Sequence, residues 1–109
     1  MGLAASHARL QMLTARKSDL ELTGQMISQA RQYLANMTSQ MFNNSANLDP
    51  DGKEAKQLNQ RVQALQAKDK SLELQLNRVD SQQKAVSTEM EAVKKVVDKN
   101  IAMTFKTFM

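Results

Sequence analysis

An apolar residue recurs at every seventh position through the second half of this chain. The series consists of Leu58, Leu65, Leu72, Val79, Val86 and Val93, and a companion series four residues later contains Val62, Leu76, Met90 and Val97. On an α-helix, a seven-residue apolar period forms a narrow seam, and another helix must cover such a seam. The repeat therefore predicts long helices that pack side by side.

The first half of the chain carries a matching seven-residue series. Its members are Leu13, Leu20, Ile27, Leu34 and Met41, with Thr23, Ala30 and Met37 each four residues before the next member. We expect these positions to form a seam on a first helix, from about residue 3 to residue 42. The intramolecular seam is then predicted to join Leu13, Leu20, Ile27 and Leu34 to Leu58, Leu65, Leu72, Val79 and Val86.

A second apolar stripe lies beside the first on the same predicted helix. It contains Ala4, Ala8, Met12, Ala15, Leu22, Met26, Tyr33 and Met37, at the three- and four-residue spacing of a helix face. Two adjoining stripes form an apolar surface that is wider than one partner helix would cover. The first helix is therefore expected to contact more than the second helix of its own chain.

One segment breaks the helical pattern, residues 43–50, within a run that is rich in Asn, Asp, Pro and Gly. These residue types favour turns. Pro50 suits the first position of a helix with Asp49 as its cap, whereas Asp51 and Glu54 offer an alternative capping box. In either frame a second helix begins near the proline and can return antiparallel to the first.

The composition fits two long helices and argues against a sheet. The 109 residues include only three Gly, one Pro and no Trp, and 4% of them are aromatic. Apolar residues make up 41% of the chain, but few are bulky, so a two-helix unit would not surround its own core. The expected fold is all-α: a single coiled-coil-like, antiparallel helical-hairpin domain of residues 1–109, with its second helix over about residues 51–107, that assembles into an oligomer or filament.

The C-terminal end of the second predicted helix is apolar. At 1.5 Å per residue this helix would be roughly 85 Å long against roughly 60 Å for the first, so about 15 to 20 residues would extend past its partner. After Val93 the apolar spacing changes to steps of four, which rotates the stripe around the helix. An uncovered apolar end indicates contact with another chain. The self-assembly interface is predicted to contain Val93, Val97, Ile101, Phe105 and Phe108.

Two polar residues, Asp69 and Gln83, fall at positions of the companion series in the second helix. Buried polar groups in a helical seam lower its stability and can set the register or the number of partners. We therefore expect these two residues to influence how the helices pair.

The sequence contains no recognisable catalytic or metal-binding constellation. It has no Cys, and its single histidine, His7, has no carboxylate or Ser at a spacing that suggests a relay. The loop that begins at Asp49 resembles the start of a calcium-binding loop, but Gln60 occupies the position of the closing glutamate. We therefore expect no enzyme activity, no cofactor and no metal.

The charges and the apolar segments bear on partners and location. The formal net charge of +4 is spread along the chain with both signs mixed, whereas nucleic-acid-binding proteins usually cluster Lys and Arg on one face. No stretch reaches the roughly 20 apolar residues that a membrane span needs. The first residues also lack the basic start and long apolar run of a cleavable signal. We therefore expect no nucleic-acid partner and no membrane span.

Two resemblances to bacterial proteins accompany these patterns. The opening MGLAASHARL resembles a group of small proteins that begin MGLAAS-x-ARL, and that group implies no activity. The layout resembles the needle and inner-rod subunits of type III secretion systems, which are helical hairpins around a Pro-containing turn. Residues 87–105 are similar to the needle ending, with Val and Lys before Asp98, Ile101 and Phe105, and Pro50 stands at the turn. The chain is longer than a typical needle subunit, and its first helix is more apolar.

The second resemblance implies a structural subunit that assembles with copies of itself into a bacterial filament or tube. A type III secretion needle or another surface appendage is such a structure, and contacts that do not close on themselves produce filaments. The protein would be secreted or displayed on the cell surface by a route that needs no signal peptide, or otherwise be cytoplasmic. A secretion apparatus or a chaperone would be a further partner. The alternative is a secretion chaperone or adaptor that acts as a small helical-bundle interaction module.

Overall fold

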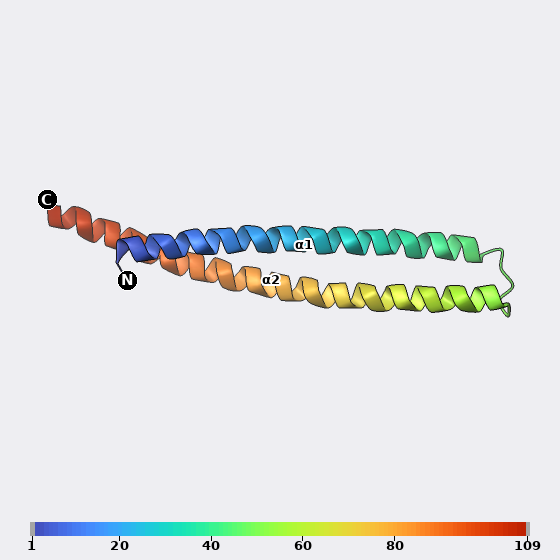
Figure 1. The fold of residues 1–109 in the computed structure, drawn as a ribbon. Helices are drawn as coiled ribbons and strands as arrows, with labels where there is room; N and C mark the ends of the chain where they lie inside the picture. Colours follow the sequence, from blue (N-terminus) through green and yellow to red (C-terminus); the bar gives the residue numbers. More distant parts are fainter. Residues whose placement is uncertain (1, 109) are drawn as a thin grey trace. The chain divides into compact units, whose positions relative to one another are not determined.

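A computed structural model describes residues 2–108 of the chain, apart from the side chain of Phe108. It contains two α-helices: α1, Leu3–Ser45, has 43 residues, and α2, Lys53–Phe108, has 56 residues. The described residues form no strand. The two helices return on each other through one loop, so the expected all-α antiparallel helical hairpin is confirmed (Figure 1).

The loop between the helices is built around Asp49. Its carbonyl oxygen accepts a hydrogen bond from the Gly52 amide at 3.0 Å, and its side chain accepts one from the Asp51 amide at 3.2 Å. The carbonyl of Gly52 then accepts the Lys56 amide at 3.2 Å, which starts α2. Pro50 therefore lies in a turn before α2, and neither capping frame expected from the sequence forms. The local bonds of an Asp side chain compete with helix capping, and here they stabilise the turn.

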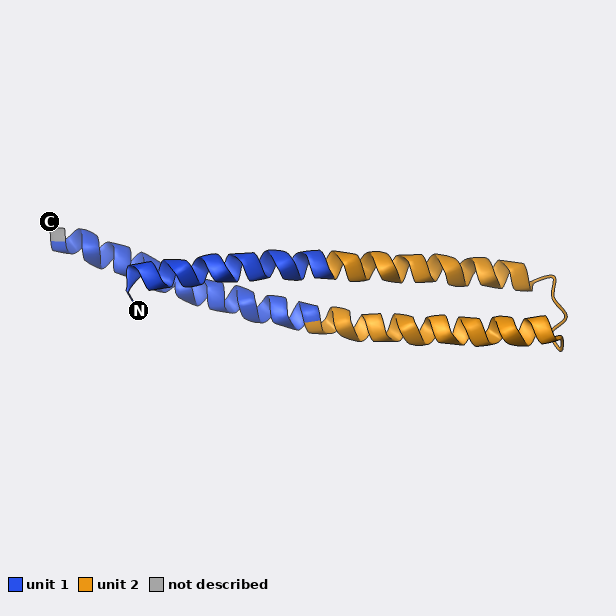
Figure 2. Cartoon of the chain, in the orientation of Figure 1, with its two compact units in different colours: residues 1–23, 79–109 blue, residues 24–78 orange. Residues whose placement is uncertain are grey.

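The hairpin divides into two compact units, each of which contains a piece of both helices (Figure 2). Unit 1 consists of residues 1–23 and 79–109, and unit 2 consists of residues 24–78 with the loop. Within each unit the α1 segment and the α2 segment run in opposite directions.

Unit 1 has a small apolar core of aliphatic side chains. Leu13, which is 1% exposed, packs in one cluster with Val86, Val93 and Val97. The partly buried Leu10, Leu20 and Met90 pack against this cluster. Since a fully buried aliphatic side chain stabilises the folded state by roughly 1.5–3 kcal/mol, this cluster supplies much of the stability of the unit.

Unit 2 has fewer fully buried side chains. Ile27, Leu34 and Val62 are buried, whereas the facing leucines of α2 remain partly exposed. The apolar repeat of α2 thus continues through unit 2, but four of its leucines are only half-buried: Leu58, Leu65, Leu72 and Leu76. A two-helix pair covers each seam from one side only, which leaves part of every long side chain accessible.

The companion positions of α1 are as expected in part. Ala30 and Met37 are half-buried, whereas Thr23 is exposed. The neighbouring Gly24 and Arg31 are also half-buried. Residues three and four positions away both lie beside the main series on a helix, so residues of both frames contribute to the covered side of α1.

The second stripe of α1 faces away from α2. Met12 and Leu22 in unit 1 are 59% and 57% exposed, and Met26 and Tyr33 in unit 2 are 61% and 65% exposed. The alanines of the stripe, Ala4, Ala8 and Ala15, are also exposed. The expectation that α2 would leave part of the apolar surface of α1 uncovered is therefore correct for these residues.

Candidate interaction surfaces

The predicted seam residues lie between the helices in both units. Leu13, Ile27, Leu34, Val79 and Val86 are buried, and Leu20, Leu58, Leu65 and Leu72 are half-buried. The first group has at most 8% exposure. Their seven-residue spacing was the signal that identified them, because that spacing keeps one side of a helix turned toward its partner.

An ion pair crosses the seam of unit 2. The Arg31 guanidinium donates to both carboxylate oxygens of Asp69, from Nε at 2.9 Å and from Nη2 at 3.3 Å. This hydrogen bond is the main reason that the pKa of Asp69 lies below its usual 3.8, and it also raises the pKa of Arg31. Two parallel N–H···O bonds restrict geometry more than a single contact does, so the pair favours one register.

The seven-residue spacing indicates that Asp69 is a polar seam residue, but it does not indicate its partner. Arg31 lies four residues after Ile27, and it is the only charged residue of α1 after Glu21. That isolation is the signal that could have identified it. Gln83, the other polar residue expected in the seam, is half-buried in unit 1.

A second ion pair lies at the edge of the seam in unit 1. The Nε atom of Arg9 donates to Glu89 Oε1 at 2.9 Å, and Nη2 contacts the same oxygen. Both side chains are partly exposed, at 38% and 41%, so solvent screens the pair and its contribution is at the low end, about 0–1 kcal/mol. The Arg9–Glu89 pair therefore acts mainly on the orientation of the two helices rather than on stability.

The predicted self-assembly interface divides into two parts. Val93 and Val97 are 6% and 8% exposed and belong to the core around Leu13, which corrects the expectation that they face other subunits. Ile101 and Phe105 are 51% and 67% exposed.

The burial of Val93 and Val97 has a geometric cause. Val93, Val97 and Asn100 continue the four-and-three spacing of the seam, and Asn100 lies beside Gly2 and Leu3 at the start of α1. The end of α2 that α1 leaves uncovered is therefore shorter than the length estimate suggested. The side chain of Phe108, the last predicted interface residue, lies outside the described residues.

The uncovered end of α2 remains apolar on its flanks. Beyond Val97, the positions that follow the seam are polar, Thr104 and Thr107, and line a shallow hollow with Leu3. Ile101 and Phe105 fall outside this line and are exposed, as is Met103 at 59%. Exposed apolar side chains gathered at one helix end are typical of a contact surface.

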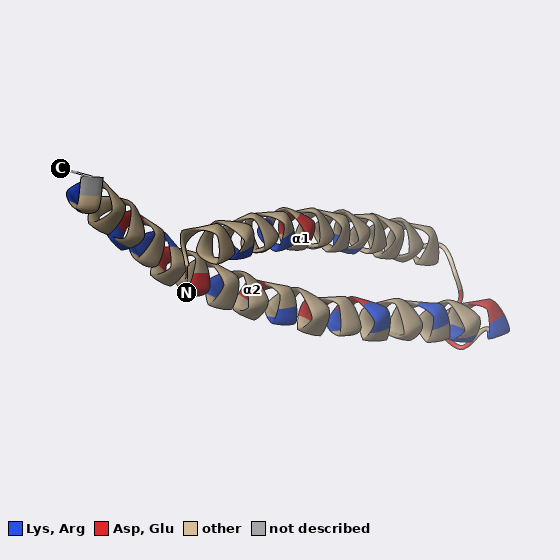
Figure 3. Cartoon of the chain, turned by 60° about the vertical axis from the view of Figure 1, so that its left-hand side comes forward, with Lys and Arg blue, Asp and Glu red and all other residues tan. Residues whose placement is uncertain are grey.

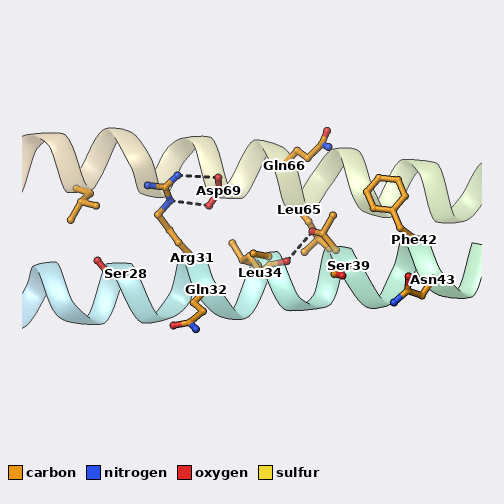
Figure 4. A pocket seen from close by; sticks show the side chains of 13 residues that line it. Ser28, Arg31, Gln32, Leu34, Ser39, Phe42, Asn43, Leu65, Gln66 and Asp69 are labelled. Atoms are coloured by element: carbon orange, nitrogen blue, oxygen red, sulfur yellow. Dashed lines mark hydrogen bonds and ion pairs between the residues drawn. The ribbon is translucent and has the colours of Figure 1, made fainter.

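A hollow with a volume of about 740 Å³ lies between the helices of unit 2. Figure 4 shows Leu34 of α1 and Leu65 of α2 facing each other in it, with the ion pair of Arg31 and Asp69 to one side and Phe42 to the other. Ala35 and Leu76 also line the hollow, and the rest of its wall is polar but uncharged, from Ser28, Gln32, Thr38, Ser39, Asn43 and Gln66. A hollow of this kind can accept an apolar side chain from another helix.

Charge is unevenly distributed between the two helices of unit 2. The α1 segment carries only Arg31, whereas the α2 segment carries both signs along its length (Figure 3). The charged residues of that α2 segment are Lys53, Glu54, Lys56, Arg61, Lys68, Asp69, Lys70, Glu73 and Arg78. The α2 side therefore meets solvent with charged side chains, whereas the polar side chains of the α1 side are almost all uncharged.

No group of three His, Cys, Asp or Glu side chains that could hold a metal ion occurs among residues 2–108. Neither helix, as far as it is described, is long and apolar enough to cross a membrane. His7 is exposed, and Ser6 is fully buried with no hydrogen-bond partner for its hydroxyl oxygen.

Comparison with known proteins finds no matching family model, no matching curated protein and no matching solved structure.

Proposed function

We propose that this protein is a structural subunit that assembles with copies of itself into a filament or tube. The observation that carries the proposal is the excess of uncovered apolar surface. Within the described residues, eleven large apolar side chains are exposed and eight are buried. Exposed apolar side chains that gather on one face are typical of a contact surface, and copies of the chain could cover them.

The exposed residues occur on two separate surfaces, which is what an open assembly requires. One is the C-terminal surface, made of Ile101, Met103 and Phe105 in unit 1, and another includes Met26 and Tyr33 on α1 in unit 2. A subunit with two different contact surfaces can join two neighbours at once, and contacts that do not close produce filaments. The resemblance to type III secretion needle and inner-rod subunits supports a bacterial surface appendage as the assembly.

The first experiment replaces one apolar side chain on the C-terminal surface. Because Phe105 is 67% exposed, Phe105→Asp should leave the helix content unchanged and abolish large particles. Ile101→Asp should act in the same way. Size-exclusion chromatography with light scattering and negative-stain microscopy would measure the particles. Leu74→Asp is the matched control, since Leu74 is 60% exposed on α2 in unit 2 and belongs to neither surface.

Two results would contradict the proposal. Wild-type protein that stays monomeric at high micromolar concentration would exclude self-assembly. Particles of unchanged size in both Asp variants would exclude the C-terminal surface as a contact.

A secretion chaperone or adaptor is the second candidate. The hollow of unit 2 favours it, because a groove with an apolar floor of Leu34 and Leu65, whose two charged side chains are paired with each other, suits a partner helix. This function predicts a discrete dimer or tetramer at all concentrations that binds a second protein in fixed ratio. The same light-scattering series distinguishes it from a growing filament.

A further inference from the structure

The α1 wall of the hollow in unit 2 has a large aromatic side chain at one end, and two small side chains lie in line with it along the helix. Phe42 stands at one end and is 53% exposed, and Ser28 stands toward the other (Figure 4). Ala35 lies between them on the same wall. The three residues are seven positions apart, so they form one line along α1. One surface therefore carries both a projecting ring and the space for one.

Such a surface is complementary to a copy of itself. A two-fold axis through Ala35 reverses the direction of a second α1 helix, so that Phe42 of each copy meets the partner's Ser28. The small side chain at the axis lets two helices approach to the separation of roughly 8–10 Å that packed helices show. The ring of Phe42 then lies over the hollow of the other copy.

The charge distribution favours a second copy over a charged partner. Between Leu22 and Leu48 the only charged residue is Arg31, and its guanidinium is bound to Asp69. A surface without free charge does not repel an identical surface, and it offers nothing to an oppositely charged one. Interface cores are depleted of charge and often contain an aromatic side chain, as this side of α1 does with Phe42.

We propose that two copies of this chain pair through the surface formed by Ser28, Ala35, Phe42 and the adjoining hollow, here called the Ala35 surface. The two α1 helices run antiparallel with Ala35 at the two-fold axis. Each Phe42 ring covers the end of the hollow next to Ser28 in the other copy. The product is a four-helix bundle built from two copies of unit 2.

The size of the hollow sets how far the contact extends. Thirteen residues line it, whereas a stable interface uses roughly 20–30 residues on each side. The hollow is therefore the centre of the contact, and neighbouring uncharged residues of α1 form its rim. Gln25 and Gln29 are exposed and carry no charge, so they suit a rim position.

This inference rests on the proposed function in one respect, that the chain associates with copies of itself. A two-fold pair closes on itself, so it does not produce a filament alone. The exposed Ile101 and Phe105 in unit 1 would supply the second contact. The two surfaces can therefore be tested separately in one full-length protein.

The test uses single cysteines in full-length Phe105→Asp protein, because the wild-type chain contains no cysteine. Ala35→Cys should form an intermolecular disulfide on mild oxidation, since a disulfide requires Cα atoms roughly 4.4–6.8 Å apart. Ser28→Cys should not, because its counterpart would lie fourteen residues along the helix, roughly 21 Å away. Ala67→Cys, at an exposed alanine on α2, is the matched control for random collision.

A second variant tests the ring itself. Phe42→Glu should weaken the dimer about tenfold or more, because a central aromatic side chain is replaced by a charge. Phe42→Leu should retain most of the dimer. Because Phe42 is exposed, neither substitution should unfold the protein, and circular dichroism of both variants checks this. Light scattering over a dilution series measures the dissociation.

The outcomes separate this inference from the proposed function. A dimer that cross-links at Ala35 but not at Ser28, and weakens in Phe42→Glu, supports the Ala35 surface. A monomeric Phe105→Asp protein, or equal cross-linking at Ala35, Ser28 and Ala67, overturns it. Large particles of the wild-type protein, together with no cross-link in the Ala35→Cys variant, overturn this inference and leave self-assembly intact. A cross-linked Ala35→Cys dimer, together with wild-type protein that never grows beyond a dimer, supports this inference and overturns the filament.

Discussion

The two units of the hairpin use the same seven-residue repeat in different ways. In unit 1 the repeat is filled by valines and leucines that form one buried cluster around Leu13. In unit 2 it contains an ion pair, Arg31 with Asp69, and a hollow of about 740 Å³ between Leu34 and Leu65. The difference shows that a heptad pattern predicts which residues face each other, but not how tightly they pack. A closely packed seam stabilises its own pair, whereas an open one leaves space for another helix.

The largest expected effect compares leucines in the two units. Leu13→Ala should destabilise unit 1 by roughly 2–5 kcal/mol, because Leu13 is 1% exposed and its removal leaves a cavity. Leu65→Ala should have a smaller effect, since Leu65 already borders a hollow. Urea denaturation followed by circular dichroism measures both. Equal losses in the free energy of unfolding would show that Leu65 packs as tightly as Leu13 despite the hollow.

Met12→Ala is the control for this comparison. Met12 is 59% exposed and adjacent to Leu13 in sequence, so its truncation should change stability little.

A smaller effect concerns the buried hydroxyl of unit 1. Ser6 is fully buried and its oxygen has no hydrogen-bond partner, so Ser6→Ala should stabilise the protein by about 1 kcal/mol. The melting temperature is the measurement. Because the backbone amide of Ser6 donates to the Gly2 carbonyl at 3.0 Å, the helix itself should be unaffected. A loss of stability would mean that the Ser6 hydroxyl has a hydrogen-bond partner that stabilises the folded protein.

The smallest expected effect is the pH dependence of the ion pair in unit 2. The pKa of Asp69 is below its usual 3.8 because Arg31 donates hydrogen bonds to its carboxylate. The stabilisation is therefore fully present above that usual value and is lost as the pH falls through the lowered pKa. Asp69→Asn should remove this part of the acid dependence.

Denaturation curves from neutral pH to pH 3, measured on wild type and the variant, check the effect. An identical acid dependence in both proteins would show that the pair does not contribute. Asp80→Asn is the control, because Asp80 is an exposed carboxylate of α2 in unit 1.

The repeat was sufficient to predict both helices and the side chains that face the seam. It was less informative about the companion positions of α1, where apolarity favoured Thr23 over Gly24. Both frames lie beside the main series on a helix, and only the position of the partner distinguishes them. The structure ends α1 at Ser45 rather than residue 42 and begins α2 at Lys53 rather than residue 51. The spacing of apolar residues gave no indication of the loop hydrogen bonds of Asp49, which set these ends.

The C-terminal interface shows a second limit. The side chains of Val97 and Ile101 are equally apolar in the sequence, yet Val97 is 8% exposed and Ile101 is 51% exposed. The sequence could not separate them, because that difference depends on where α1 begins relative to α2. Nor could it identify Arg31 as the partner of Asp69, since the residues are 38 positions apart and meet only in one register.

By itself the sequence determined that this protein is a pair of long helices with a polar turn, since helix period and turn chemistry are local properties of the chain. It also determined that apolar surface exceeds what two helices can cover. Only the tertiary structure decided the register, and with it the Arg31–Asp69 pair, the hollow beside Phe42 and the burial of Val93 and Val97. Register depends on contacts between residues far apart in sequence, so no local pattern contains it.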